Sequence, residues 1–236
     1  SISRRVQTQQ PCPFHEAEMG CQRTLNPEKV GRHRADDRRI FESGDWSQVK
    51  NRKGRRRAMG RFTMENDRLA VTIDDLGAEL VSVYDKKYKR EIIWQGDPTW
   101  WKRQAPILFP NVGKYYGGEY LYQGRHYVQD QHGFARDYEL ERMEESGNSV
   151  THRFVSNEET RKVYPFDFEL LITHRLTGAE VEIQWQIKNT GDHEMYFTIG
   201  GHPGFNVPVL PGTAYSDYAL KFADDQNELK YIHIDM

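Results

Sequence analysis

The chain has 236 residues, with 33 Lys and Arg against 35 Asp and Glu, and two cysteines, Cys12 and Cys21. No run of about 18 consecutive apolar residues is present, which excludes a membrane-spanning helix and a membrane partner of that kind, and the first residues lack the apolar stretch of a secretory signal. Both cysteines lie in the first tenth of the chain, so a disulfide framework is excluded for the rest and we expect a cytoplasmic protein.

Charge divides the chain into two segments. Residues 1–58 carry 14 Lys and Arg against 7 Asp and Glu, whereas residues 59–236 carry 19 against 28. The basic run at 52–57 would suit a nucleic-acid arm or a targeting signal, but the lack of any apolar period favours a disordered, solvated extension. The change of composition at Met59, itself a candidate natural start, predicts one folded domain over 59–236, whose acidic balance predicts no nucleic-acid partner.

The first half of this domain shows short runs with the period of strands. Residues 69–73 and 80–84 are predicted strands joined by a turn, and residues 91–94 are a third. A Trp-rich stretch bounded by prolines, 98–110, is predicted to be irregular. Two short apolar runs separated by Gln-Gly-Arg then predict a hairpin over 120–128.

The second half shows stronger alternation. Residues 166–176 and 181–187 alternate apolar with polar side chains around a Thr-Gly turn, which predicts an antiparallel hairpin with one buried face. Residues 195–199 are a further predicted strand, and 217–222 with 229–234 a further pair. No segment shows a convincing amphipathic helix. The predicted fold is therefore all-β, a large antiparallel β-sandwich that is incomplete at its C-terminal end.

Histidines at strand ends are the main candidates for chemistry. The sequence has no HExxH pattern, no cysteine pair in the domain and no phosphate-binding glycine loop, so no metal site is predicted. His202 stands between glycines and a proline where a strand ends, a position at which β scaffolds often carry functional groups, and His132 belongs to a second His-Gly pair upstream. Spacing alone favours a structural His202, and a simple ion pair for Arg136 and Asp137. His174 lies on the apolar face of its strand, so we expect a core histidine whose hydrogen bonds are satisfied.

Several aromatic residues leave two interpretations open. Aromatic rings stack on the apolar faces of sugar rings, so these residues would suit the floor of a sugar site, and they would equally suit a core. The residues are Trp100, Trp101, Tyr115 and Tyr116.

Three motifs then occur in a specific order. They are Phe-Pro-Asn-Val-Gly-Lys at 109–114, His-Gly-Phe-Ala-Arg-Asp at 132–137 and Gly-Gly-His-Pro-Gly-Phe at 200–205. In this order they resemble the motifs of the aldose 1-epimerase (galactose mutarotase-like) family, and most of all its LacX-like branch. The resemblance covers about residues 61–236 and implies the large β-sandwich of that family.

The resemblance implies a cofactor-free isomerase that interconverts the α and β anomers of a hexose by opening and closing the ring. Opening needs a base for the C1 hydroxyl proton and an acid for the ring oxygen. By resemblance His202 is the acid, and His132 is the second catalytic residue and holds the sugar near the reacting oxygens. The residues expected around the sugar are Asn111, Lys114, His132, Arg136 and Asp137. In the main branch of the family an arginine follows the asparagine. Val112 occupies that position here, and Lys114, two places later, replaces the cation. Arg136 and Asp137 either contact the sugar or brace the loop of His132.

The resemblance also implies a general base, a glutamate in a late motif, and no matching motif is present. Glu228 is not followed by such a motif. We therefore expect a truncated chain that is weak or inactive, from a gene whose complete product is an epimerase. Three alternatives remain open: a hexose 6-phosphate epimerase, which needs two cations near C6; a carbohydrate-binding sandwich without catalysis; and a fragment without a stable fold.

Overall fold

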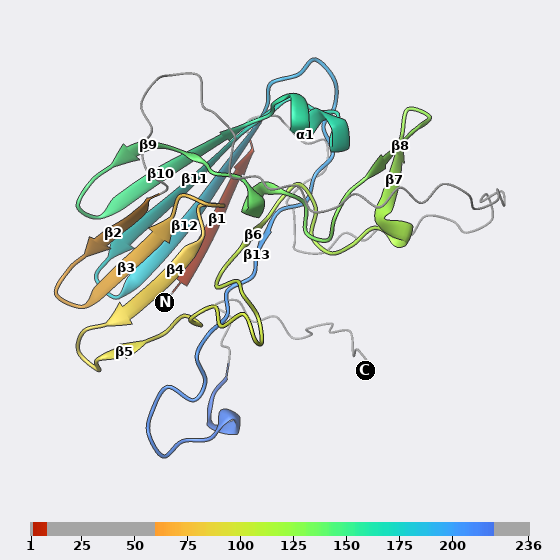
Figure 1. Cartoon of the computed structure of the whole chain (residues 1–236). Helices are drawn as coiled ribbons and strands as arrows, with labels where there is room; N and C mark the ends of the chain where they lie inside the picture. The colour runs from red at the N-terminus through yellow and green to blue at the C-terminus, as the bar shows by residue number, and fades with distance from the viewer. Residues whose placement is uncertain (1, 9–59, 220–236) are drawn as a thin grey trace, which may run out of the picture. The chain divides into compact units, whose positions relative to one another are not determined.

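Two mainly antiparallel sheets organise the computed structural model, which describes residues 2–8 and 60–219 (Figure 1). The larger sheet consists, in spatial order, of β1 (Ile2–Thr8), β12 (Glu180–Asn189), β11 (Phe168–Thr177), β10 (Ser149–Val155) and β9 (Glu141–Glu145). The smaller sheet consists of β2 (Arg61–Glu65), β3 (Leu69–Asp74), β4 (Leu80–Asp85) and β5 (Arg90–Glu91). Two short pairs stand beside them: β7 (Glu119–Tyr122) with β8 (Arg125–Val128), and β6 (Ile107–Leu108) with β13 (Gly200–Gly201).

Alternation of apolar and polar residues turns one face of each sheet into a shared core. Phe168, Leu170 and Ile172 of β11 are fully buried, and Trp185 of β12 lies opposite Ile172. Val71 of β3 belongs to the same apolar cluster, so both sheets contribute to one core. The predicted all-β antiparallel sandwich is confirmed.

The strongest sequence patterns gave the correct elements. The hairpin predicted from 166–176 and 181–187 is β11 with β12, paired antiparallel over its whole length. The hairpin predicted at 120–128 is β7 with β8, and the strands at 69–73 and 80–84 are β3 and β4. The strand predicted at 91–94 is shorter: β5 ends at Glu91, and Ile93 makes only an isolated bridge with Phe205.

Two strands and one helix were missed because their sequences lack a clear apolar pattern. Strands β9 and β10 pair antiparallel, but the sequence of β9 is Glu-Arg-Met-Glu-Glu and a histidine interrupts the apolar alternation of β10. The helix α1 (Glu158–Val163) has no apolar stripe, and its start is defined by a capping box between Asn157 and Thr160.

The strand predicted at 195–199 is wrong. This segment is extended but unpaired, held to its neighbour by a hydrogen bond from Thr198 N–H to Pro110 O at 2.9 Å. Its apolar and β-branched residues resemble a strand in sequence, yet Tyr196 is exposed because the segment crosses from β12 to β13 rather than joining a sheet.

At the N-terminus, a strand was not predicted from the sequence, but Ile2–Thr8 forms β1 and pairs in parallel with residues 181–187 of β12. The basic run and both cysteines lie outside the described residues. Most of the strand pair predicted at 217–222 and 229–234 also lies outside the described residues. Only 217–219 are described, and Asp217 is the last residue of the short 3-10 helix Tyr215–Asp217.

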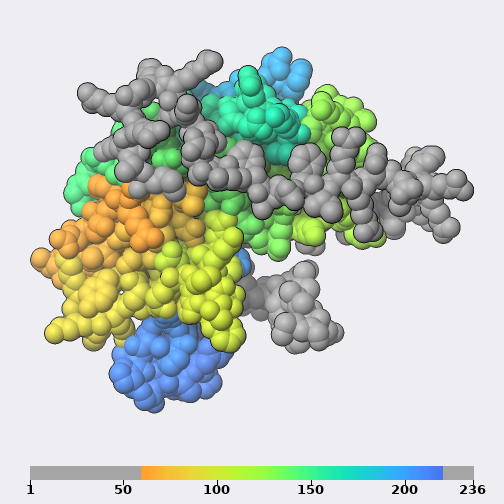
Figure 2. Space-filling view, in the orientation of Figure 1, coloured from red at the N-terminus to blue at the C-terminus, as the bar shows by residue number. Residues whose placement is uncertain are grey.

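The segment after β13 returns to the smaller sheet. Trp94 N–H donates to Gly204 O at 3.0 Å, and Asn206 N–H donates to Ile92 O at 2.9 Å. In Figure 2 this segment, in blue, packs against the yellow end of the smaller sheet. The loop that carries the third sequence motif is therefore tied to the sandwich at both of its ends.

Candidate active site

The three motifs meet beside the short pair β6 and β13. Leu108 lies opposite Gly200 and Ile107 opposite Gly201, so the 200–205 motif begins beside the end of β6. The next residue, Phe109, forms a parallel bridge with Gly133 of the second motif. Segments separated by up to about ninety positions along the chain are therefore brought together by backbone pairing alone.

Gly133 is the closest contact between two of these motifs. Its φ is +68°, and a Cβ at this position would lie 2.3 Å from Phe109 O. The same carbonyl oxygen accepts hydrogen bonds from Phe134 N–H at 3.0 Å and Ala135 N–H at 3.1 Å. Only glycine fits where these two backbone segments come so close together, which explains the glycine of the His-Gly pair in the sequence.

His132 is held in one tautomer by the first motif. Its own N–H donates to Gly113 O at 2.7 Å, and Gly113 N–H donates to Nδ1 of the imidazole at 3.0 Å. Because Nδ1 accepts, the neutral ring carries its proton on Nε2, which lies 3.2 Å from the side-chain amide of Gln131. Burial lowers the pKa of the His132 imidazole, and the charges of Arg136 and His202 lower it further, so the ring is neutral at neutral pH.

His202 is placed by its backbone and by one aromatic neighbour. Its backbone N–H donates to Pro106 O at 3.0 Å, and its exposed ring packs against Trp101 in a T-shaped arrangement, with ring centroids 5.3 Å apart. The centroid of the His132 ring lies 6.0 Å away. Both imidazoles can therefore reach neighbouring oxygen atoms of one small ligand.

Asn111 and Lys114 differ in their placement. Asn111 is buried; its Nδ2 donates to Gly113 O at 2.9 Å, while its Oδ1 has no partner among the described residues. Lys114 is exposed and makes no hydrogen bond or ion pair within the described part of the chain. The structure thus places Asn111 directly under the loop that holds His132 and leaves Lys114 at the surface beside it.

Arg136 and Asp137 brace the second motif. Arg136 Nη2 donates to Gln131 O at 2.7 Å, which closes the loop around His132. Asp137 pairs with the guanidinium of Arg103 and lies 3.7 Å from Arg136 Nε. Burial lowers the pKa of Arg136, and the nearby charge of Arg103 lowers it further. Among the two roles left open by the sequence, these contacts correspond to bracing.

Sequence reasoning missed Arg103 and Glu79 and left Trp101 undecided. Glu79 is buried, and its Oε1 accepts from Gln104 N–H at 2.6 Å and Ala105 N–H at 2.9 Å. Arg103 lies 3.8 Å from Glu79 Oε2 and reaches the second motif from there. A single acidic residue in a predicted turn gives no sign that it is buried, so only the structure identifies this network.

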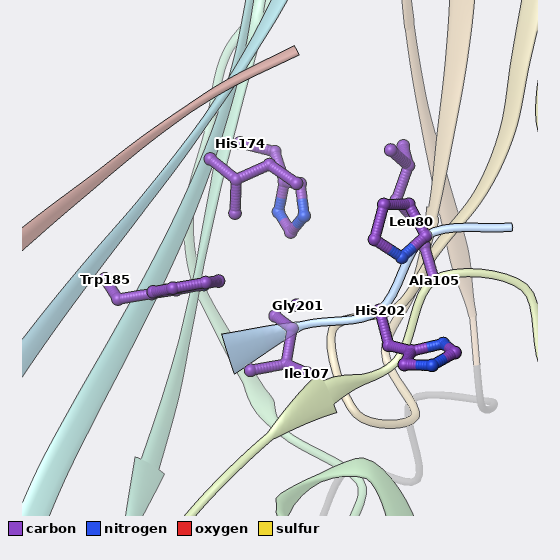
Figure 3. A pocket seen from close by; sticks show the side chains of 9 residues that line it. Leu80, Ala105, Ile107, His174, Trp185, Gly201 and His202 are labelled. Carbon is purple, nitrogen blue, oxygen red and sulfur yellow. The ribbon is translucent and has the colours of Figure 1, made fainter. Parts of the chain in front are cut away.

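Behind His202 a narrow pocket leads into the core (Figure 3). It is lined by Leu80, Ala105, Ile107, His174, Ile183, Trp185, Gly201, His202 and Pro203. The imidazole of His174 points into it, and neither ring nitrogen has a partner among the described residues. His174 is a core histidine as predicted, but the expectation that its hydrogen bonds are satisfied is wrong, because the strand presents it to apolar walls. Burial lowers its pKa to about 3, so it is neutral.

Two absences concern only the residues that the structure describes. Within 2–8 and 60–219 no three His, Cys, Asp or Glu side chains are grouped to hold a metal ion. Across the same ranges, every helix is too short or too polar to span a bilayer.

Comparisons with known proteins agree with the three motifs. A family model described as aldose 1-epimerase matches residues 60–230. The chromosomal protein LacX of Lactococcus lactis subsp. lactis is 36% identical over 167 residues, which are 68% of this chain and 56% of that protein.

Solved structures of galactose mutarotase-like proteins are also similar to this chain. A galactose mutarotase related enzyme from Lactobacillus acidophilus is 42% identical with a TM-score of 0.64, over 65% of this chain and 51% of that one. A galactose mutarotase-like protein from Lactobacillus casei is 38% identical with a TM-score of 0.62, over 64% of this chain and 52% of that one. The chain spans about half the length of these relatives.

Proposed function

The chain belongs to the aldose 1-epimerase family, and on this premise we propose that it carries the acid half of a sugar-epimerising site for a free hexose. The observation that supports this most directly is the pair of imidazoles 6.0 Å apart on two loops that pair with β6 and its continuation. The His132 ring is oriented by the first motif, and the His202 ring is exposed on its loop, so a sugar could contact both.

The two rings would act on adjacent oxygens of the hemiacetal. When the C1 hydroxyl loses its proton to a base, the electron pair forms the C1 carbonyl, the bond from C1 to the ring oxygen breaks, and His202 protonates that oxygen. His132, whose Nε2 carries a proton, donates a hydrogen bond to a sugar oxygen and orients the ring. Rotation about C1–C2 and the reverse proton transfers then give the other anomer.

The described residues offer no base for the first of these transfers. No described carboxylate hydrogen-bonds to or pairs with His132 or His202, and Asp137 is engaged by Arg103. An acid without its base lacks a contribution of about 10²–10⁴-fold. We therefore propose that the described residues alone support only low turnover, and that a carboxylate opposite His202 is what a fully active site requires.

Mutarotation of freshly dissolved α-glucose and α-galactose, followed by polarimetry, tests the assignment. We expect slow catalysis above the buffer rate that His202→Ala and His132→Ala each abolish. The exposed His193 is the matched control, and His193→Ala should leave the rate unchanged. Equal rates for all four chains would reject the assignment.

Sugar binding separates catalysis from a carbohydrate-binding module without turnover. The indole of Trp100 is exposed beside Trp101, as either function would use it. Saturation-transfer NMR with glucose should detect binding to the wild-type chain. Binding that survives both histidine substitutions, without any turnover in the wild type, would favour the binding module.

A hexose 6-phosphate substrate is the second candidate, favoured by one observation. Arg103 and Arg136 lie close enough that one guanidinium perturbs the other. Their charges are nevertheless offset by Glu79 and Asp137, which reduces the attraction for a phosphate dianion and favours the neutral sugar. Mutarotation rates for glucose and glucose 6-phosphate, measured side by side, decide between them: a faster rate with the phosphate would reverse our preference.

A further inference from the structure

The side chain of Arg103 contacts both the turn before β4 and the loop of His132. Its Nη1 lies 3.8 Å from Glu79 Oε2 and donates to Arg136 O at 2.8 Å, and its Nη2 pairs with Asp137 Oδ1. The side chain is largely buried, so this geometry is not that of a solvated surface arginine. We call these four residues, Glu79, Arg103, Arg136 and Asp137, the Arg103 clasp.

On one side the clasp is continuous with His202. Glu79 fixes the backbone next to Arg103 through Gln104 N–H and Ala105 N–H. The same short segment, residues 101–106, supplies three contacts to the third motif: the Trp101 ring against His202, Gln104 O to Gly204 N–H at 2.8 Å, and Pro106 O to His202 N–H at 3.0 Å. Displacing this segment displaces His202.

On the other side the clasp is continuous with His132. Arg103 holds the short 3-10 helix Ala135–Asp137 through the side chain of Asp137 and the backbone carbonyl of Arg136. Arg136 in turn donates to Gln131 O, the residue before His132. Gly77, with φ +68°, packs against the backbone of Arg136, where a Cβ would come within 2.8 Å, so the helix has little freedom to shift alone.

We propose that Arg103 is a positioning residue that sets the distance between the His132 and His202 rings, and therefore the fit of a sugar between them. The inference rests on the proposed function for its consequence in catalysis, but the placement of the rings can be measured without turnover. Arg103 does not touch either imidazole, so it acts through the two segments that it joins.

NMR titration of the full chain with ¹³C-labelled histidine rings tests the placement. In the wild type, His202→Gln should raise the pKa of His132, because one nearby positive charge is removed. In an Arg103→Met background the same His202→Gln substitution should raise it by less than about half as much, because the rings lie farther apart. The charge lost with Arg103 itself is common to both chains of that background and cancels in the comparison.

Two further variants distinguish positioning from a general structural role. Arg103→Lys keeps the charge facing Glu79 and Asp137 without the planar fork, so it should restore part of the response. Lys102→Met, at the exposed neighbouring position, should behave as wild type. An undiminished response in Arg103→Met, accompanied only by a lower melting temperature, would overturn the proposal.

Kinetics supply the second readout. In a chain with measurable mutarotation, Arg103→Met should lower kcat about 10–100-fold and change KM less than about threefold, because misplacing an acid by about 1 Å costs turnover more than binding. If the wild type shows no turnover on any hexose, the proposed function fails, while the titrations still decide whether Arg103 positions the two rings. A fall in KM alone, with kcat unchanged, would also contradict the positioning role.

Discussion

Four histidines divide between two regions of the molecule. His152 and His174 lie in the larger sheet and are fully buried, whereas His132 and His202 lie on loops that meet beside β6 and β13. The sheet pair is surrounded by core side chains. The loop pair is surrounded by backbone groups and stays accessible from outside.

The difference shows that burying a histidine and positioning it for a ligand depend on different parts of the fold. In a strand, alternation alone decides that a histidine faces the core, and the surroundings must then tolerate it. His152 finds a partner, Asp75, at 3.0 Å, and His174 finds none among the described residues. On the loops, a hydrogen bond from Gly113 N–H orients the His132 imidazole, and one from the His202 backbone N–H to Pro106 O places His202, without burying either ring completely.

The largest expected effect lies in the sheet region, at the ion pair beneath His152. Arg142 donates to both carboxylate oxygens of Asp75 at 2.7 Å, and both side chains are about nine-tenths buried. Removing one partner leaves the other charge buried, so Arg142→Leu should lower the free energy of unfolding by about 3–5 kcal/mol. Urea unfolding measured by circular dichroism checks this value.

The matched control is the exposed pair of Arg175 and Glu182, at 3.0 Å on the same sheet. Arg175→Leu should cost less than about 1 kcal/mol, because solvent screens this pair. Equal losses of unfolding free energy for the two substitutions would show that burial does not govern the stability of the sheet region. The contrast between the buried sheet histidines and the accessible loop histidines would then no longer hold.

Sequence alone identified the sheets and the motifs but not the contacts between them. The alternation in β11 and β12 specified both strands and their buried face. The order of the motifs identified His132 and His202, and the structure brings these two rings together. Strand β9 escaped notice because its sequence is polar, and β10 because His152 occupies a core position that is explained only by Asp75, a residue 77 positions away.

The candidate site shows the same limit. Asn111, Arg136 and Asp137 were chosen by resemblance, and their observed contacts are with the protein itself. Glu79 and Arg103 carry no local signal, since a buried carboxylate is recognisable only once its backbone donors at Gln104 and Ala105 are known. Long-range polar contacts of this kind depend on tertiary structure and leave no periodic pattern in the sequence.

The second prediction concerns the unpartnered His174. Burial first, and the neighbouring His152 second, lower its pKa to about 3 from an ordinary value of about 6.5. The unfolded chain therefore takes up a proton below pH 6.5 while the folded chain does not, so stability falls as the pH falls. Between pH 7 and pH 5 this one group should remove about 2 kcal/mol from the free energy of unfolding.

His174→Leu removes that dependence and isolates it from the rest of the protein. At pH 7 the variant should unfold within about 1 kcal/mol of the wild type, because the lost ring had no hydrogen bond to lose. At pH 5 it should be about 2 kcal/mol more stable relative to the wild type than at pH 7. Parallel urea curves at the two pH values measure the difference, and a constant gap between the two chains would mean that His174 has a partner after all.

The smallest expected effect, in the loop region, concerns His132. Burial lowers its pKa, and the charges of Arg136 and His202 add to the shift, so its contribution to stability is also present above pH 6.5 and declines as the pH falls below it. The ring is only half-buried, and solvent reduces the energy of its protonation in the folded chain. His132→Gln should therefore flatten the pH dependence in the same direction as His174→Leu, but by less. If His132→Gln had the larger effect, the loop histidine would be the more deeply constrained of the two, and its availability to a sugar would have to be abandoned.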